Sequence, residues 1–212
     1  MKPRIWTCGS FGLVMLMLVS SAIAQLRTQM LKGDFAFSGS GICVNSPATF
    51  FPAYQPPAGF SADLRPLGFT NVITFSAQGV RTFNGDGTGN ATSRSVSLVN
   101  PGPASAVDNS SQFTYSVAAD RTLTIDDGPS HGVFVAGVRV GQEISTSNVP
   151  SFVGRVSSDG RSLTLASFNP GVETVTRLVP APELVEAVRI CHRAANAIRI
   201  SRTPGAGGLD ED

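Results

Sequence analysis

The chain consists largely of short segments in which apolar and polar residues alternate, separated by turn-forming residues. These segments recur every 8–12 residues or so, the spacing typical of a sandwich or barrel of antiparallel strands. The clearest hairpin is RVSSDGRSLTL, residues 155–165, because Asp-Gly tolerates the positive φ angles of a tight turn. The sequence therefore predicts an all-β domain.

The predicted strands can be placed by their alternation, with turns at 119–120, 126–129, 158–160 and 169–171. A break is expected at Gln78-Gly79. Residues 182–200 mix helical and strand spacing, and we expect a helical turn at 183–187 and a last strand from about 188 to 200. The other predicted strands are 34–44, 69–77, 80–83, 92–99, 112–118, 122–126, 132–140, 152–157, 162–168 and 173–179.

The stretch TFNGDGTGNAT, residues 82–92, has the glycines and amides of a ligand loop. An EF-hand alignment would put Thr82 first and Ser93 twelfth, so both essential carboxylates are missing. A phosphate-binding loop would be followed by a lysine and a helix, whereas a strand pattern follows here. The stretch is predicted to be a glycine-rich hairpin turn, and no metal site is expected.

The N-terminus has the layout of a secretory signal peptide. Lys2 and Arg4 precede an apolar core at 11–19, and Ala22-Ile23-Ala24 supplies small residues for cleavage between Ala24 and Gln25. No later segment has the ~20 apolar residues of a membrane-spanning helix. We therefore expect a secreted or periplasmic protein whose mature chain has no membrane span.

The predicted domain organisation follows from that cleavage. Residues 1–24 are the signal peptide, 25–33 a lead-in segment, 34–200 the β-barrel domain and 201–212 a disordered acidic tail. The mature chain would have 188 residues, with 14 basic against 15 acidic, a balance that does not suggest nucleic acid as a partner.

Removal of the signal also removes Cys8, which leaves Cys43 and Cys191. In an oxidising compartment, two cysteines have one possible intramolecular pairing, so a structural disulfide is predicted between them. The alternative is a catalytic or metal-binding cysteine. Cys191 and His192 would point to opposite faces of a strand, which argues against joint action.

Residues 45–68 form a long, proline-rich segment that cannot be a central strand. Four aromatic residues lie within it. They could line an apolar ligand pocket at one mouth of a barrel, plug that end as ordinary core, or form a patch for a protein partner. The candidate ligand-binding residues are Phe50, Phe51, Tyr54 and Phe60.

The sequence has no motif of a nucleophile with its base. His131 lies near Asp126 and Asp127, a trio that could perform acid–base chemistry in a cleft, but a surface histidine in a turn is the commoner case. No catalytic residue and no cofactor are therefore expected, and the protein is more plausible as a non-enzyme.

Four segments resemble an uncharacterised family of small exported bacterial proteins: GDFAFSGSGICV (33–44), TFNGDGTGNAT (82–92), FTYSVAADRTLTI (113–125) and RICHRAANAIRI (189–200). The resemblance covers most of residues 33–200. It implies a single antiparallel β-barrel, calycin-like or allene-oxide-cyclase-like, of about 8–10 short strands. The G-x-W motif of ligand-binding lipocalins is missing, because the mature chain has no tryptophan.

Together these features favour an exported, non-catalytic β-barrel protein of unknown specific role, in which the loop at 45–68 is the candidate for binding a small apolar ligand or a partner. Two alternatives stay open. One is a barrel enzyme of the cyclase or isomerase type, and the other is a surface interaction protein whose barrel is filled with side chains.

The signal-peptide interpretation predicts a defined mature N-terminus. When the full chain is expressed with an export pathway, the recovered protein should begin at Gln25. N-terminal sequencing and intact mass measure this directly. Recovery of a chain that retains Met1–Ala24 would contradict the interpretation.

Overall fold

The structure is a computed structural model that describes residues 28–47, 59–100, 102–179 and 184–201. The predicted signal peptide, residues 48–58 of the proline-rich segment and the tail from residue 202 lie outside the described residues. The ten strands are β1 (Gly33–Pro47), β2 (Asn71–Phe83), β3 (Thr88–Asn100), β4 (Ala104–Val117), β5 (Thr122–Ala136), β6 (Glu143–Ser147), β7 (Phe152–Val156), β8 (Ser162–Ser167), β9 (Val172–Val179) and β10 (Leu184–Ser201).

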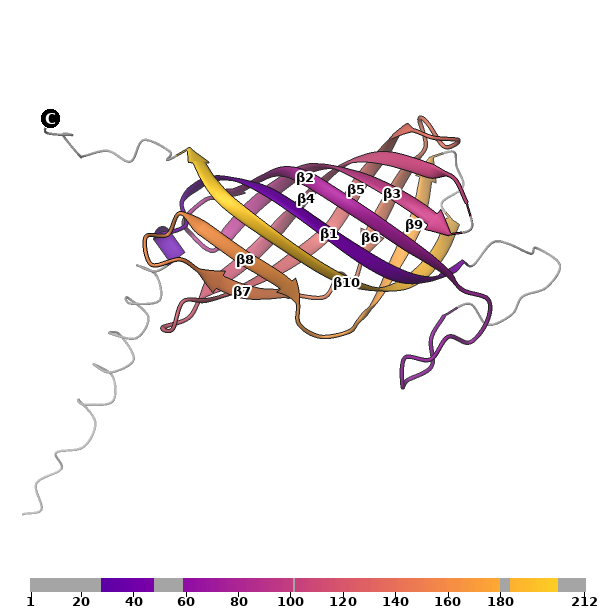
Figure 1. The fold of residues 1–212 in the computed structure, drawn as a ribbon, viewed down its shortest axis with the longest axis horizontal. Helices are drawn as coiled ribbons and strands as arrows, with labels where there is room; N and C mark the ends of the chain where they lie inside the picture. The colour runs from indigo at the N-terminus through magenta and orange to yellow at the C-terminus, as the bar shows by residue number, and fades with distance from the viewer. Residues whose placement is uncertain (1–27, 48–58, 101, 180–183, 202–212) are drawn as a thin grey trace, which may run out of the picture.

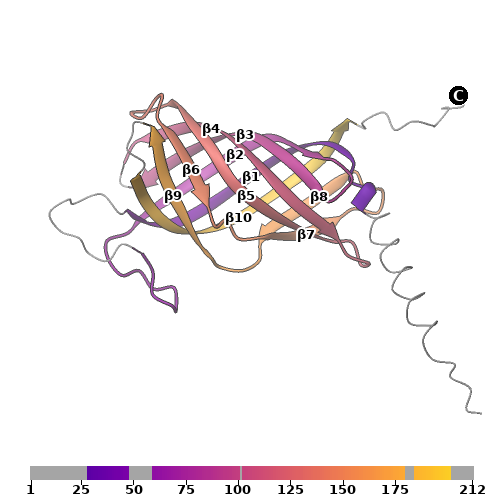
Figure 2. The same cartoon turned by 180° about the vertical axis from the view of Figure 1, so that it is seen from behind.

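The strands form one antiparallel sheet that closes on itself. β1 to β5 follow one another as neighbours, and β1 also pairs with β10 (Figure 1). The long strands β5 and β10 are bridged at one end by β6 and β9 and at the other end by β7 and β8. Eight strands therefore surround the axis at either end, which confirms the predicted all-β barrel; Figure 2 shows it from behind.

Several strands are longer than the sequence suggested. β2 runs through the expected break at 78–79. The glycine there has another role, since a side chain at position 79 would lie only 2.0 Å from the Thr92 carbonyl oxygen on β3. Glycine there permits close approach of β3 without ending the strand. β10 includes residues 184–187, so the helical turn expected there is wrong for these residues.

The turn expected at 126–129 is also wrong. β5 is continuous from Thr122 to Ala136 and joins two predicted strands. Its register with β4 shifts between Ser111 and Phe113, opposite this Asp-Asp-Gly-Pro stretch, so the irregularity is a β-bulge. β6 is a further strand that was not predicted from the sequence.

One end of the barrel is filled by a hydrophobic core. Phe83 makes edge-to-face contacts with Phe35, Phe113 and Tyr115, at centroid distances of 5.2, 5.1 and 4.8 Å. A single helical turn at residues 28–31 closes this end, and the Tyr115 hydroxyl donates to the Thr28 carbonyl at 3.1 Å. The other core members are Leu31, Ala91, Val117, Leu123, Ile125, Phe152, Val156, Leu163, Leu165 and Ala197.

The predicted disulfide between Cys43 and Cys191 is confirmed. The two residues are direct register partners on β1 and β10, the strands whose pairing closes the barrel. Both side chains are buried. The bond links positions 148 residues apart, so it constrains nearly the whole described chain in the unfolded state.

Removing this bond should destabilise the barrel. For Cys43→Ala/Cys191→Ala we expect the free energy of unfolding to fall by about 2–5 kcal/mol, because a very long loop is no longer closed in the unfolded chain. Urea unfolding of the purified mature protein measures this. Reducing agent should lower the midpoint of the wild type and leave the double variant unchanged; equal midpoints without reductant would contradict the expectation.

Candidate ligand-binding cavity

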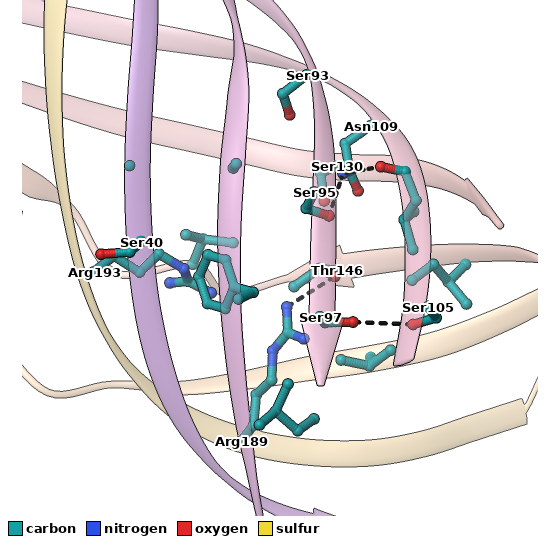
Figure 3. A pocket seen from close by; sticks show the side chains of 18 of the residues that line it. Ser40, Ser93, Ser95, Ser97, Ser105, Asn109, Ser130, Thr146, Arg189 and Arg193 are labelled. Carbon is teal, nitrogen blue, oxygen red and sulfur yellow. Dashed lines mark hydrogen bonds between the residues drawn. The ribbon is translucent and has the colours of Figure 1, made fainter. Parts of the chain in front are cut away.

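The half of the barrel opposite the core is hollow. It contains a cavity of about 550 Å³ whose wall includes residues from all ten strands. The connections at 102–103 and 138–139 also line it, which places its mouth at the end where β3 passes into β4 and β5 into β6. Figure 3 shows part of this wall.

The cavity exists because many inward-facing residues at this end are small. Gly39, Ala77 and Ala195 line it, whereas phenylalanine and leucine fill the other end. An eight-stranded barrel is just wide enough to be filled by large side chains, so small ones leave open space. On β3 the usual alternation is inverted: serines point inward, whereas Val96 and Leu98 are each 52% exposed on the outside.

One wall of the cavity is polar and is formed by β3 and β4. Asn109 Nδ2 donates to Ser95 Oγ at 3.1 Å, and the Ser97 and Ser105 hydroxyls lie 3.0 Å apart (Figure 3). Ser93 lies on the same side. In the ring of eight strands β4 stands opposite β10, so these hydroxyl and amide groups face the β10 wall across the cavity.

An apolar wall lies between them, on β1 and β2. Phe37, Ile73 and Phe75 line it. The Phe75 ring occupies the space that a side chain at Gly41 would need, since a Cβ there would lie 2.5 Å from the ring. Glycine at position 41 therefore leaves room for this ring against β1, with its centroid 5.8 Å from the Arg193 guanidinium carbon.

The β10 wall contains an arginine–glutamate cluster, made of Glu173, Arg189 and Arg193. Glu173, on β9, has no exposed side-chain area. Arg189, its direct register partner, donates from Nε to Oε2 at 3.0 Å, and Arg193 donates to the same carboxylate through both terminal nitrogens. Arg189 Nη2 also reaches Thr146 Oγ1 at 3.5 Å (Figure 3).

The disulfide lies beside this cluster. Cys191 stands between the two arginines on the inner face of β10, and its sulfur is 3.7 Å from Glu173 Oε2. A disulfide sulfur has no proton to donate, so this is a packing contact. The bond that closes the barrel thereby also fixes the part of β10 from which both arginines project.

Burial lowers the pKa of the Arg189 guanidinium from its ordinary value, and Arg193 lowers it further, whereas the charge of Glu173 and its hydrogen bond raise it. Arginine stays protonated in proteins, so the cluster has two positive charges and one negative. Deeper in the cavity, Arg81 forms a bidentate pair with Asp127, at 2.8 and 2.9 Å. The Arg81–Asp127 pair is neutral by itself, so the arginine–glutamate cluster keeps its own surplus of one positive charge.

The structure describes only one of the four aromatic residues proposed for ligand binding. Phe60 is half-buried, bridges to Pro66 and is not among the residues that line the cavity. Phe50, Phe51 and Tyr54 lie outside the described residues, and their role stays a prediction. The Gly59 amide donates to Ser46 Oγ at 3.2 Å, so the segment returns beside the end of β1 that faces the mouth.

The acid–base trio considered around His131 does not assemble. Asp127 points into the barrel toward Arg81, whereas His131 lies on the outer face with its Nε2 3.0 Å from Glu143. Among the described residues, no group of three or more histidine, cysteine or acidic side chains is placed to hold a metal ion. Within the same residues, no helix is long and apolar enough to cross a membrane.

Sequence reasoning missed the arginines and the inward serines of the site. Arg189 and Arg193 lie within the segment whose secondary structure was ambiguous, and Glu173 begins a predicted strand with no visible link to them. The one available signal was the four-residue spacing of Arg189 and Arg193, which puts both on one face of a strand.

No protein-family model matches the chain, and no curated protein matches it significantly. Two solved structures show weak likeness. One is the enduracididine biosynthesis enzyme MppR, complexed with the condensation product of pyruvate and imidazole 4-carboxaldehyde: 11% identity, 80% of this chain and 88% of that chain covered, TM-score 0.22. The other is an acetoacetate decarboxylase-like enzyme from Sphingomonas wittichii RW1: 7% identity, 81% and 94% covered, TM-score 0.15. At these TM-scores neither supports an argument about this chain.

The buried cluster predicts unequal effects of two isosteric substitutions. Glu173→Gln should lower the free energy of unfolding by about 3–5 kcal/mol, because two largely buried arginines lose their counter-charge. Asp108→Asn, which breaks an exposed pair with Arg94, should have a much smaller effect, because solvent screens that pair. Chemical denaturation compares the two; equal effects would contradict the assigned role of Glu173.

Proposed function

We propose that this protein is an exported, non-catalytic binding protein that holds a small amphipathic molecule inside its barrel. The observation that carries the proposal is the cavity of about 550 Å³. Its size lies within the range of roughly 300–1,000 Å³ of ligand pockets, and it combines apolar walls with a few polar groups, as such pockets do.

The contrast between the two ends of the barrel supports this proposal over a filled barrel. Protein interiors are normally close-packed, and large voids are destabilising. Here the core end is packed with aromatic and aliphatic residues, while glycine, alanine and serine occupy many of the inner positions at the other end. A ligand that fills this space would supply the missing contacts.

The polar wall refines the kind of ligand. The sequence suggested an apolar molecule, but Ser95, Ser97, Ser105 and Asn109 form a polar wall beside the apolar wall of Phe37 and its neighbours. A molecule with an apolar body and polar substituents matches both sides.

We also propose that the protein is exported and that it is related to the uncharacterised family of exported barrels that its sequence resembles. The disulfide supports it, since disulfides persist in oxidising compartments. We further propose that Phe50, Phe51, Tyr54 and Phe60 add apolar contacts for the ligand. This is supported by the return of the segment beside the mouth at Gly59. Phe50→Ala/Tyr54→Ala would then weaken binding.

A barrel enzyme of the cyclase or isomerase type is the second candidate. The observation that favours it is the placement of arginines in a cavity, because preorganised cations stabilise negative charge that develops during a reaction. Chemical analysis of a co-purified ligand before and after incubation with the protein separates the two candidates: a carrier returns the ligand unchanged.

A large side chain introduced into the cavity should weaken ligand binding. The neutral fluorescent probe N-phenyl-1-naphthylamine is expected to bind the mature protein, and Ala77→Phe should weaken its binding by at least about tenfold, because the new ring takes up cavity space. Fluorescence titration measures the dissociation constant.

Ser76→Phe is the matched control. Ser76 is the preceding residue on β2 and is exposed on the outer face, so the same ring added there leaves the cavity open. Both variants should retain the β-rich circular dichroism of the wild type. Unchanged probe binding in Ala77→Phe, or equal loss in both variants, would refute binding inside the barrel.

A further inference from the structure

The arginine–glutamate cluster extends the proposed function, on which this inference rests. We propose that the cluster is an anion-binding subsite and that the ligand carries one negatively charged head group, a carboxylate, which binds Arg189. The ligand class is therefore an amphipathic monocarboxylic acid.

The charge balance is the first argument. Buried charges in proteins are paired, because an uncompensated one is costly to desolvate. Glu173 can neutralise one of the two arginines that contact it. The other carboxylate on the cavity wall, Asp127, is already held in a bidentate pair by Arg81. A ligand carboxylate supplies the missing negative charge.

The hydrogen-bond geometry identifies the arginine that is available. Arg193 uses both terminal nitrogens on Glu173. Arg189 spends only Nε on Glu173 and its Nη2 on Thr146, and within the part of the chain that the structure describes its Nη1 has no hydrogen-bond partner. A guanidinium has five N–H donors, so Arg189 retains donors for a ligand.

Position and exposure agree with this assignment. Arg189 is 21% exposed and lines the cavity, compared with 14% for Arg193 and none for Glu173. The Thr146 hydroxyl, which accepts from Arg189, has a proton of its own that can be donated to the same anion. The cluster thus offers a charged donor and a neutral donor side by side.

The surplus of one positive charge within the cluster itself, two arginines on one glutamate, matches a monoanion. The remaining walls set the rest of the ligand: its apolar body would contact Ile73 and Phe75, and its polar substituents would face the serines of β3. One arginine would be enough to neutralise the buried Glu173 carboxylate, whereas two arginines contact it.

The test uses two ligands that differ only in the head group. Dodecanoate and dodecan-1-ol are titrated against mature protein loaded with N-phenyl-1-naphthylamine, a neutral reporter that does not need the subsite. At neutral pH we expect dodecanoate to displace the reporter at a concentration about tenfold lower than dodecan-1-ol.

Arg189→Gln should weaken dodecanoate binding by roughly 10- to 100-fold, the size expected for a lost hydrogen bond between charged groups. It should change the dissociation constants of the reporter and of dodecan-1-ol by less than about twofold, because Glu173 keeps its pair with Arg193 and the barrel stays folded. Arg189→Lys should recover most of the preference for dodecanoate. Arg94→Gln, on the outer face, is the control that should change nothing.

The outcomes separate this inference from the proposed function. Equal displacement by dodecanoate and dodecan-1-ol in the wild type would overturn the anion subsite while leaving the binding function intact. Failure of the reporter to bind at all would overturn the binding function and the subsite with it. If Arg189→Gln lost the reporter together with dodecanoate, Arg189 would have a structural role, and the inference would be wrong.

Discussion

The pairing of β1 with β10 is the interaction on which the rest of the structure depends. It joins the first and last strands from Asp34 and Ser201 to Pro47 and Ala187, and it turns an open sheet into a barrel without unpaired edges. The disulfide reinforces this seam from inside. Closure gives every strand an inner and an outer face, and both the packed core and the cavity consist of residues on the inner one.

The same closed sheet produces a filled end and a hollow end because the inner residues differ in size. Phe83 and Leu123 belong to the packed core. Above the core, many inner residues are small, among them Gly39, Ala77 and the serines of β3, and the space between the walls stays open. A different pair of short strands completes the ring at each end: β6 with β9 around the cavity, and β7 with β8 around the core. A rigid, packed base thereby supports an open binding chamber.

The fold class and several turns were predictable because they depend on local chemistry. Gly85 and Gly87 adopt positive φ in the hairpin turn after β2, and Gly160 does so in the Asp-Gly hairpin. The predicted break at Gly79 and turn at Asp126–Pro129 were wrong for a physical reason. Gly79 permits a close approach between two strands, and the Asp-Asp-Gly-Pro stretch forms a bulge within β5. Elsewhere in the chain the same residue types end strands. Local composition does not distinguish these uses.

The sequence alone determined most of the alternating strands, several of the turns between them and the one available pairing of Cys43 with Cys191. Tertiary structure decided what lies inside the barrel. Glu173 contacts Arg189 and Arg193, 16 and 20 residues away, only because the register of β9 and β10 puts them on one inner wall. The inward serines of β3 and the outward Val96 and Leu98 invert the pattern that identifies a core. Strand periodicity shows that a residue faces one side of a sheet, and only closure decides which side is enclosed.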